Sequence, residues 1–251
     1  VILSDVAGAG KLTTNKVYGS LAYHQMIGIS SLLTAGFNAG WVNKRINTSD
    51  LTFPDQFDGK FFSNQVPTSV LLDVSSVSYF DLQAGINYAY FPTDKTYLNG
   101  GIAIWHINRP RESFFSTEQS GFDSRLSPRF SGFLNGSFKI NEEVIINPMA
   151  YYTIQAKASE LTAGIYAQYN LKEAREIQLL AGLYYRMNDA IIPMVGLTWN
   201  NIRLLFSYDV TISSLNKYNQ SRGAWEFSLI NYGLYNEYKG DKRQSLCPVF
   251  K

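Results

Sequence analysis

Charge, histidine, cysteine and long apolar runs are all scarce in this sequence. Charged residues make up 17% of the 251 positions and aromatic residues 15%, which is less charge and more aromatic content than an average soluble domain has. The net charge of +2 gives no support for nucleic acid as a partner. No apolar stretch approaches the roughly 18 to 20 residues of a membrane helix. The one cysteine, Cys247, cannot form an internal disulfide.

Motifs for catalysis, cofactors and metals are missing as well. The two histidines, His24 and His106, stand on different predicted strands, with no cysteine or carboxylate at metal-ligand spacing. G-x-S-x-G, P-loop and CxxC motifs are absent, and the Gly-rich residues 8–10 precede no helix. We therefore predict that the chain is not an enzyme and has no catalytic residues, cofactor or metal site.

Alternation with a period of two is what the sequence contains instead. Between residues 161 and 171 every second side chain is apolar, and the side chains between them are polar or small; residues 177–185 repeat the pattern. Eleven such stretches are predicted as strands, and no helix with caps interrupts them. They are 14–27, 31–44, 74–91, 96–108, 129–140, 143–157, 160–171, 175–187, 190–199, 202–213 and 222–234. The sequence therefore predicts an all-β fold with one domain spanning residues 1–251.

The predicted connections alternate between short ones and longer ones. Short connections include residues 92–95, 141–143 and 200–201, whereas 47–67 and 109–128 are long, and two others are of medium length. Antiparallel neighbours then place all short turns at one end, as in an outer-membrane β-barrel with periplasmic turns and extracellular loops. A soluble β-sandwich, the alternative fold, has no reason to sort its loops in this way.

The composition of the two strand faces favours lipid around the chain. One face is predicted to be polar or small, and a packed core of such residues would bury unpaired polar groups; its members include Ser131, Asn135, Ser137, Thr162, Gly164, Gln168, Asn170, Ser207 and Asp209. The other face is apolar, with aromatic residues near strand ends at Trp41, Tyr169, Trp199 and Trp225. We predict a transmembrane antiparallel barrel whose apolar face contacts outer-membrane lipid.

The first residue is Val1, without an initiator methionine or signal peptide. Eleven strands that begin outside need an odd number before them if the total is even. We expect residues 1–4 to be the tail of an earlier strand and 5–13 the loop after it. The signal peptide and the first strands are then missing from this chain.

Several stretches together resemble one family of proteins. They are GSLAYHQM (19–26), LTFPDQFDG (51–59), HINRPRESF (106–114), RMNDAIIPMVGL (186–197), SYDVTISSL (207–215), GAWEFSLI (223–230) and CPVF (247–250). In this order they resemble the PorP/SprF family of outer-membrane proteins, which is associated with type IX secretion and gliding motility in Bacteroidota.

The resemblance implies about three further strands before residue 1, and therefore about 14 strands in the full protein. It also implies a role without catalysis. It implies support for the export or cell-surface anchoring of specific cargo, often adhesins, through binding of the cargo's C-terminal domain. Other type IX secretion components are further partners that it implies. A porin or small-ligand transporter is the alternative function, and an outer-membrane enzyme would need a catalytic set that the sequence does not show.

Two groups of residues are candidates for binding cargo or another partner. Arg186, Asp209 and Glu226 are predicted on the polar face of neighbouring strands, with Asp189 at the rim; they either steer a cargo segment or form a structural ion-pair network. The long loops carry the second group, Phe53, Phe57, Phe61, Phe62, Phe114 and Phe115. These aromatics form a docking surface, plug the barrel or pack within their own loops.

Overall fold

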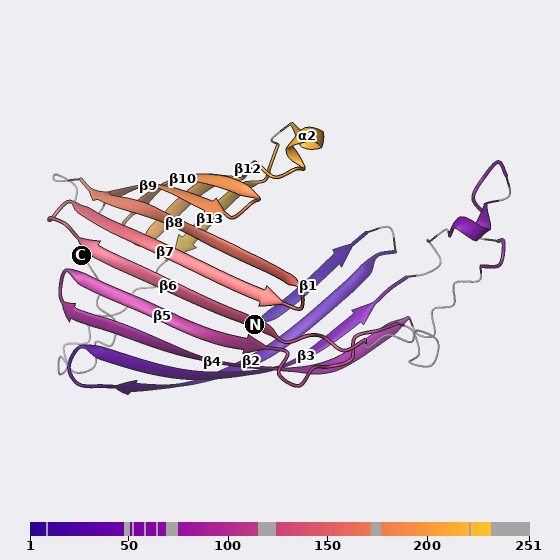
Figure 1. Ribbon diagram of the computed structural model, residues 1–251, viewed down its shortest axis with the longest axis horizontal. Coiled ribbons are helices and arrows are strands. Elements are labelled where there is room, and N and C mark those ends of the chain that lie inside the picture. The colour runs from indigo at the N-terminus through magenta and orange to yellow at the C-terminus, as the bar shows by residue number, and fades with distance from the viewer. Residues whose placement is uncertain are drawn as a thin grey trace. The chain divides into compact units, whose positions relative to one another are not determined.

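The computed structural model describes residues 1–8, 10–47, 51, 53–57, 59–63, 65–68, 75–114, 124–171, 177–220 and 222–231. Strands dominate this part of the chain and form one 13-stranded sheet, ordered β1 to β11 and then β13, with the short β12 beside β10 (Figure 1). The predicted all-β antiparallel fold is confirmed. Closure of the sheet into a barrel stays a prediction.

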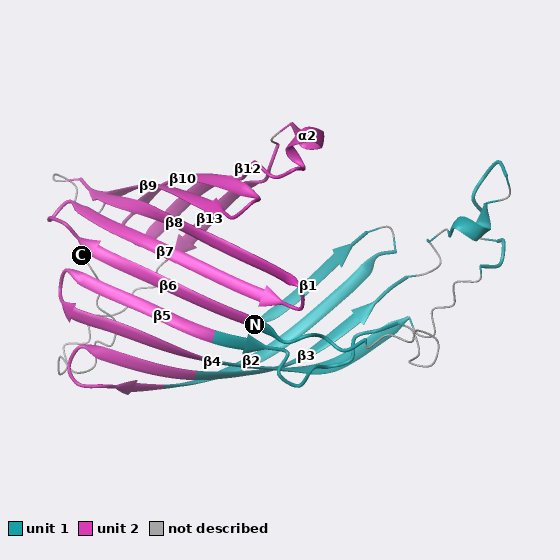
Figure 2. Cartoon of the chain, viewed as in Figure 1, with its two compact units in different colours: residues 1–23, 36–85, 103–129 teal, residues 24–35, 86–102, 130–251 magenta. Residues whose placement is uncertain are grey.

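Residue contacts divide the chain into two units (Figure 2). Unit 1 comprises residues 1–23, 36–85 and 103–129, and unit 2 comprises residues 24–35, 86–102 and 130–251. The boundary cuts across strands β2 to β5, so each of these strands contributes a segment to each unit, and it leaves Arg129, the first residue of β6, in unit 1. The two units are described separately below.

The strands match the predicted ranges closely. In chain order they are β1 (Ile2–Ala7), β2 (Leu12–Met26), β3 (Ser31–Arg45), β4 (Ser76–Thr93), β5 (Thr96–Trp105), β6 (Arg129–Lys139), β7 (Val144–Gln155), β8 (Ala158–Asn170), β9 (Ile177–Arg186), β10 (Ala190–Trp199), β11 (Ile202–Tyr208), β12 (Val210–Thr211) and β13 (Trp225–Asn231). A 3-10 turn, η1 (Pro54–Gln56), and a one-turn helix, α2 (Asn216–Asn219), lie in connections. None of the helices in the described part of the chain has the length and hydropathy of a membrane span.

One predicted boundary is wrong, and one predicted strand is divided in two. The first strand runs to Ala7 and pairs with β2 from Ile2↔Val17 to Ala7↔Leu12, so the loop expected over residues 5–13 shrinks to a turn. Asp5 does not end this strand because it lies opposite Thr14 on the polar face. The stretch 202–213 is divided at Asp209 into β11 and β12. Both pieces pair with β10 in one continuous register, from Trp199↔Ile202 to Ala190↔Thr211. Asp209 N–H donates to Ala224 O at 3.0 Å, next to the pair Tyr208↔Trp225 of β11 and β13.

The predicted sorting of short and longer connections holds only in part. Residues 46–75 and 106–128 in unit 1 and 209–224 in unit 2 are long, but the two connections expected to be of medium length, 156–157 and 187–189, are tight turns. Ala156 (φ 52°) and Asn188 (φ 59°) adopt the left-handed conformation that such turns need. Their shortness comes from two non-glycine residues with positive φ, which the sequence pattern does not reveal.

The apolar face of unit 2 is exposed and its polar face is shielded. Pairing places Leu183 opposite Ile165 and Pro193, whereas Gly182 lies opposite Tyr166 and Met194 on the other face. Leu183 is 54% exposed, while Leu180 on the opposite face is only 3% exposed. This face assignment agrees with the predicted one, but the shielded face also carries large apolar side chains, among them Ile145, Leu180, Met194 and Leu205.

Unit 1 repeats this arrangement. Phe37, Trp41 and Phe80 are exposed, and buried Val42 and Asp81 alternate with them along β3 and β4. Among the described residues of the whole chain, the buried hydrophobic core is limited to Val42, Ala89, Ile145, Leu180 and Ala190. Such a small core cannot offset the conformational entropy that a chain of this length loses on folding in water. The fold is therefore built for an apolar surrounding, in which the exposed face is also desolvated.

Candidate functional site

A buried carboxylate organises the polar face of unit 1. Asp81, on β4, has no exposed surface. Its Oδ2 accepts hydrogen bonds from Tyr18 Oη (2.7 Å) and Gln83 Nε2 (3.1 Å), and its Oδ1 lies 2.7 Å from His106 Nδ1. Asn38 extends the network by donating to Gln83 Oε1 at 2.9 Å. These donors replace the hydrogen bonds to water that a buried carboxylate loses. Because they come from β2, β4 and the residue after β5, Asp81 links these three segments.

The contact between Tyr18 and Asp81 depends on a glycine between them. Tyr18 belongs to β2 and Asp81 to β4, so the phenol must cross the intervening strand β3. Gly40 provides the crossing point, because a Cβ atom added there would lie only 2.7 Å from Cγ of the Tyr18 ring. The ring therefore lies directly on the backbone of β3.

The segment that follows β5 is fastened to β4 by its side chains and backbone. His106 (φ 57°) turns the chain, and Ile107 N then donates to Leu82 O at 3.0 Å. Asn108 donates from Nδ2 to Phe80 O (2.7 Å) and accepts from Leu82 N at Oδ1 (3.1 Å), so its side-chain amide takes the place of a strand partner. The HINRPRESF stretch thus folds back onto residues 79–83 of β4.

Glu112 completes this attachment. Its Oε1 accepts from Lys44 Nζ on β3, and its Oε2 accepts from Tyr79 Oη on β4. Backbone bonds from Glu112 N to Ser124 O (3.0 Å) and from Leu126 N to Pro110 O (2.9 Å) join the two ends of the long connection. The base of the 106–128 connection is consequently fixed to the strands.

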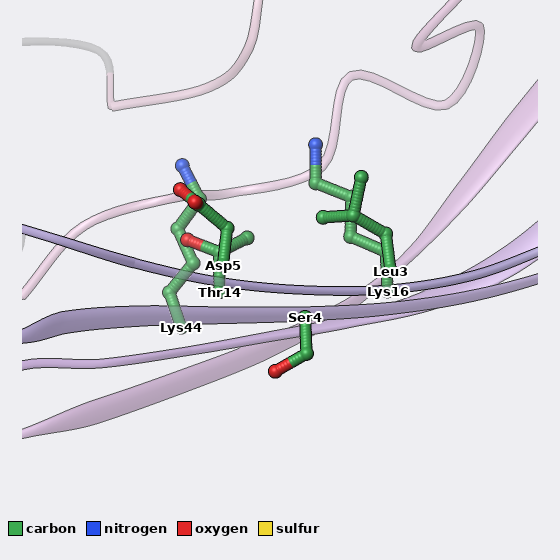
Figure 3. A pocket seen from close by; sticks show the side chains of 6 residues that line it. All are labelled: Leu3, Ser4, Asp5, Thr14, Lys16 and Lys44. Carbon is green, nitrogen blue, oxygen red and sulfur yellow. The ribbon is translucent and has the colours of Figure 1, made fainter. Parts of the chain in front are cut away.

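A shallow hollow of about 360 Å³ opens on the same face, lined by Leu3, Ser4, Asp5, Thr14, Lys16 and Lys44. In Figure 3 the side chains of Asp5, Thr14 and Lys44 project to one side of the strands and Ser4 to the other. Ser4 instead donates to Asn15 Oδ1 at 2.8 Å. The two lysines and the carboxylate that line this hollow make the wall polar here, as the predicted face assignment requires.

The charged candidates of unit 2 come together around Arg186. Its Nη1 lies 3.0 Å from both Asp189 Oδ2 and Asp209 Oδ2, and its Nε lies 3.9 Å from Glu160 Oε1. Arg186 thereby links the turn after β9 to the connection that follows β11. Glu226 is exposed on β13, opposite Ser207 and on the same face. Among the described residues, the ion pairs of Arg186 are with Glu160, Asp189 and Asp209 and do not include Glu226. Glu160, which the sequence reasoning missed, takes its place.

The phenylalanines of the first long connection lie on a folded hairpin. Gln56, only 4% exposed, accepts from Phe53 N (2.9 Å) and donates to Val66 O (2.6 Å), and its own carbonyl accepts from Ser63 N (3.1 Å). Around this glutamine Phe57 and Phe62 form a β-bridge with ring centroids 5.0 Å apart.

Three of these phenylalanines are exposed on the hairpin, and the other candidates differ. Phe57, Phe61 and Phe62 are 48%, 73% and 58% exposed; we call them the Phe patch. Phe53 and Phe114 are half-buried, and Phe115 lies outside the described residues.

The sequence reasoning missed Asp81 and the residues that hold it. Asp81 and His106 are 25 residues apart, and only the left-handed turn at His106 brings them together. A signal was present, because Asp81 and Gln83 interrupt an otherwise apolar stretch at alternate positions and so mark one face of β4. In the part of the chain that the structure describes, no cluster of three or more His, Cys, Asp or Glu side chains could hold a metal ion.

The family model for "Type IX secretion system membrane protein PorP/SprF" matches residues 1–230. The comparison with curated proteins finds no matching relative. Among solved structures, the chain is similar to the Ralstonia pickettii toluene transporter TbuX (13% identity, 80% of this chain and 63% of that one, TM-score 0.45). It is similar also to a Pseudomonas aeruginosa FadL homologue (11%, 88% and 65%, 0.47) and to the KdgM porin (10%, 93% and 96%, 0.41). The chain spans less than two thirds of TbuX and of the FadL homologue, and at these TM-scores the likenesses carry no functional inference.

Proposed function

Because the chain belongs to the PorP/SprF family of type IX secretion system membrane proteins, we propose that it is a non-enzymatic outer-membrane barrel. It supports the export or surface anchoring of specific cargo. It does so by binding the C-terminal domain of the cargo, such as an adhesin, directly or together with other secretion components. Short turns and the C-terminus face the periplasm, and the long connections face the outside.

The Phe patch is the observation that carries the proposal. Contiguous exposed aromatic side chains mark protein interfaces, and aromatic residues are enriched among the hot-spot residues that contribute most of the binding energy. The patch is preformed, because buried Gln56 holds the hairpin through three hydrogen bonds to its backbone. A preformed patch loses little conformational entropy when a partner docks. The Arg186 cluster supplies the second candidate contact, as a charged rim that orients the cargo.

The test replaces the patch and leaves its scaffold intact. The full-length protein carrying Phe57→Ser, Phe61→Ser and Phe62→Ser is tagged, extracted in detergent from its own cells, and compared with the wild type for co-purifying cargo. The matched control is Leu215→Ser with Tyr218→Ser, which removes two exposed side chains (58% and 87%) from a different connection.

We expect the patch variant to lose at least roughly tenfold in retained cargo, since exposed hot-spot aromatics contribute about 2 kcal/mol or more each. The control variant should retain cargo as the wild type does. Full retention by the patch variant, or a wild type that co-purifies with nothing and conducts ions in a planar bilayer, would contradict the proposal and favour a porin.

A further inference from the structure

Two buried hydrogen-bond donors in unit 1 lack acceptors. Trp105 Nε1, at the end of β5, and Arg129 Nε, at the start of β6, are both shielded from solvent and have no partner among the described residues. Leaving a buried donor unpaired costs about 1–3 kcal/mol, and more when the group is charged. Two such donors beside each other therefore indicate an acceptor that the described residues do not supply.

Two carboxylates of unit 1, Asp81 and Glu112, already have other partners. Both oxygens of Asp81 are occupied, one by His106 and the other by Tyr18 and Gln83. Both oxygens of Glu112 are also occupied, by Lys44 and Tyr79.

Arg129 also differs from the arginines of unit 2. Arg186 is surrounded by carboxylates, and Arg203 donates from Nε to Thr198 Oγ1 at 3.0 Å. No hydrogen bond or ion pair holds the Arg129 guanidinium within the described part of the chain. An unpaired ionisable group in a membrane-spanning wall is by default a candidate functional site.

The geometry of the pair defines what it can bind. The Arg129 guanidinium carbon lies 4.2 Å from the centroid of the Trp105 ring, so the indole holds it in place through a cation–π contact. Its N–H groups point outward in the guanidinium plane, where they match a flat, two-oxygen acceptor. Ile104 and Phe130, the adjoining residues along each strand, are exposed on the apolar face, so Trp105 and Arg129 lie on the polar face.

We propose that Trp105 and Arg129 form a binding site for a carboxylate on the polar face of unit 1. The carboxylate comes from an acidic side chain or terminus of a polypeptide, or from a small free acid. This site does not depend on cargo binding at the Phe patch. It assigns a recognition role to residues that the family match and the sequence motifs leave without one.

Trp105 reports on its own site once the other tryptophans are removed. The substitutions Trp41→Phe, Trp199→Phe and Trp225→Phe leave Trp105 as the single indole of residues 1–251, because this sequence has four tryptophans. In detergent, its fluorescence is titrated with sodium acetate, with a blocked pentapeptide containing one glutamate, and with the same peptide containing glutamine. Sodium chloride holds the ionic strength constant. Arg129→Gln is the test variant and Arg203→Gln the control.

We expect acetate or the glutamate peptide to change the emission in a saturable way, and Arg129→Gln to weaken binding at least roughly tenfold. Arg203→Gln should bind as the parent does. Tighter binding of the glutamate peptide than of acetate identifies a polypeptide source, and equal binding identifies a small acid. Retained electrophoretic heat-modifiability of Arg129→Gln shows that it still folds.

The proposal is overturned if sodium chloride reproduces the change, if the glutamine peptide binds equally well, or if Arg129→Gln binds like the parent. It is overturned also if nothing saturates, in which case ordered water alone satisfies the two donors.

Discussion

At the scale of residues, Asp81 shows how the chain carries a buried charge. A carboxylate without exposed surface is costly unless donors surround it, and Tyr18, Gln83 and His106 supply them. The donors come from three separate stretches of sequence, so the contact also fixes the arrangement of the strands. Removing any one donor leaves Asp81 partly unsatisfied.

Gly40→Ala tests the crossing that lets Tyr18 reach Asp81. The added methyl group would overlap the Tyr18 ring and push it off β3, which costs roughly 1–3 kcal/mol of folding free energy. We expect a lower thermal midpoint in detergent, followed by the loss of β-sheet circular dichroism. Gly36→Ala in the same strand is the control, because its nearest neighbour, Leu21 O, lies 3.9 Å from the added Cβ. Equal midpoints for the two variants would contradict the proposed packing.

At the scale of elements, the connection after β5 is held to β4 by the side-chain amide of Asn108, which bonds to the β4 backbone as a neighbouring strand would. Asn108→Ala removes its hydrogen bonds to Phe80 O and Leu82 N. We expect the amide of Leu82 to exchange with deuterium roughly tenfold faster, since a lost hydrogen bond is worth about 1 kcal/mol. Asn141→Ala, which disturbs only the turn before β7, should leave that amide unchanged. Unaltered exchange in Asn108→Ala would mean that the backbone bond from Ile107 suffices.

Arg186 fixes a second connection, and its loss should expose that connection to protease. Arg186→Gln frees Asp189 and Asp209, whose half-exposed ion pairs are worth roughly 0–1 kcal/mol each. Trypsin should then cleave up to about tenfold faster at Lys217 or Arg222 in the connection after β11. The control variant Arg203→Gln, which changes a residue on the same face, should be cleaved at the same rate as the parent. If trypsin also cleaves Arg186→Gln at the parental rate, the ion pairs do not restrain the connection. The backbone hydrogen bonds to Asp189 O are then what holds it.

The elements also show how far the sequence predicts this structure. Alternation locates β10 to the residue, because period two is a property of the chain alone. The approach of Arg186 to Asp209 follows from the same parity, since both residues belong to the polar face. Asp81 and His106 were missed because a single left-handed residue decides their contact, and the tight turn at Asn188 was missed for the same kind of reason. The alternation of the sequence determines on which face of the sheet a residue lies, whereas the geometry of the turns determines which residues on that face come into contact.

At the scale of the whole molecule, each unit exposes its apolar face and shields its polar one. A soluble protein has the opposite arrangement, with its apolar side chains shielded. We therefore predict that the polar face tolerates an added charge and the exposed apolar face does not. Leu183→Lys, in the middle of β9 on the exposed face, should cost roughly 2–4 kcal/mol in a bilayer. Gln178→Lys on the polar face of the same strand should cost far less. The measurement is the denaturant midpoint of each variant folded into lipid vesicles, and equal midpoints would contradict the face assignment.

Spin-label scanning of β9 tests most directly whether the apolar face contacts lipid. In a Cys247→Ser background, single cysteines from Ile177 to Arg186 are labelled in vesicles, and their accessibility to oxygen and to a water-soluble nickel reagent is measured. We expect oxygen accessibility to peak at the odd positions, Ile177, Leu179, Ala181, Leu183 and Tyr185, and nickel accessibility at the even ones. Maxima at the even positions for oxygen, or no period of two, would contradict a lipid-facing apolar surface.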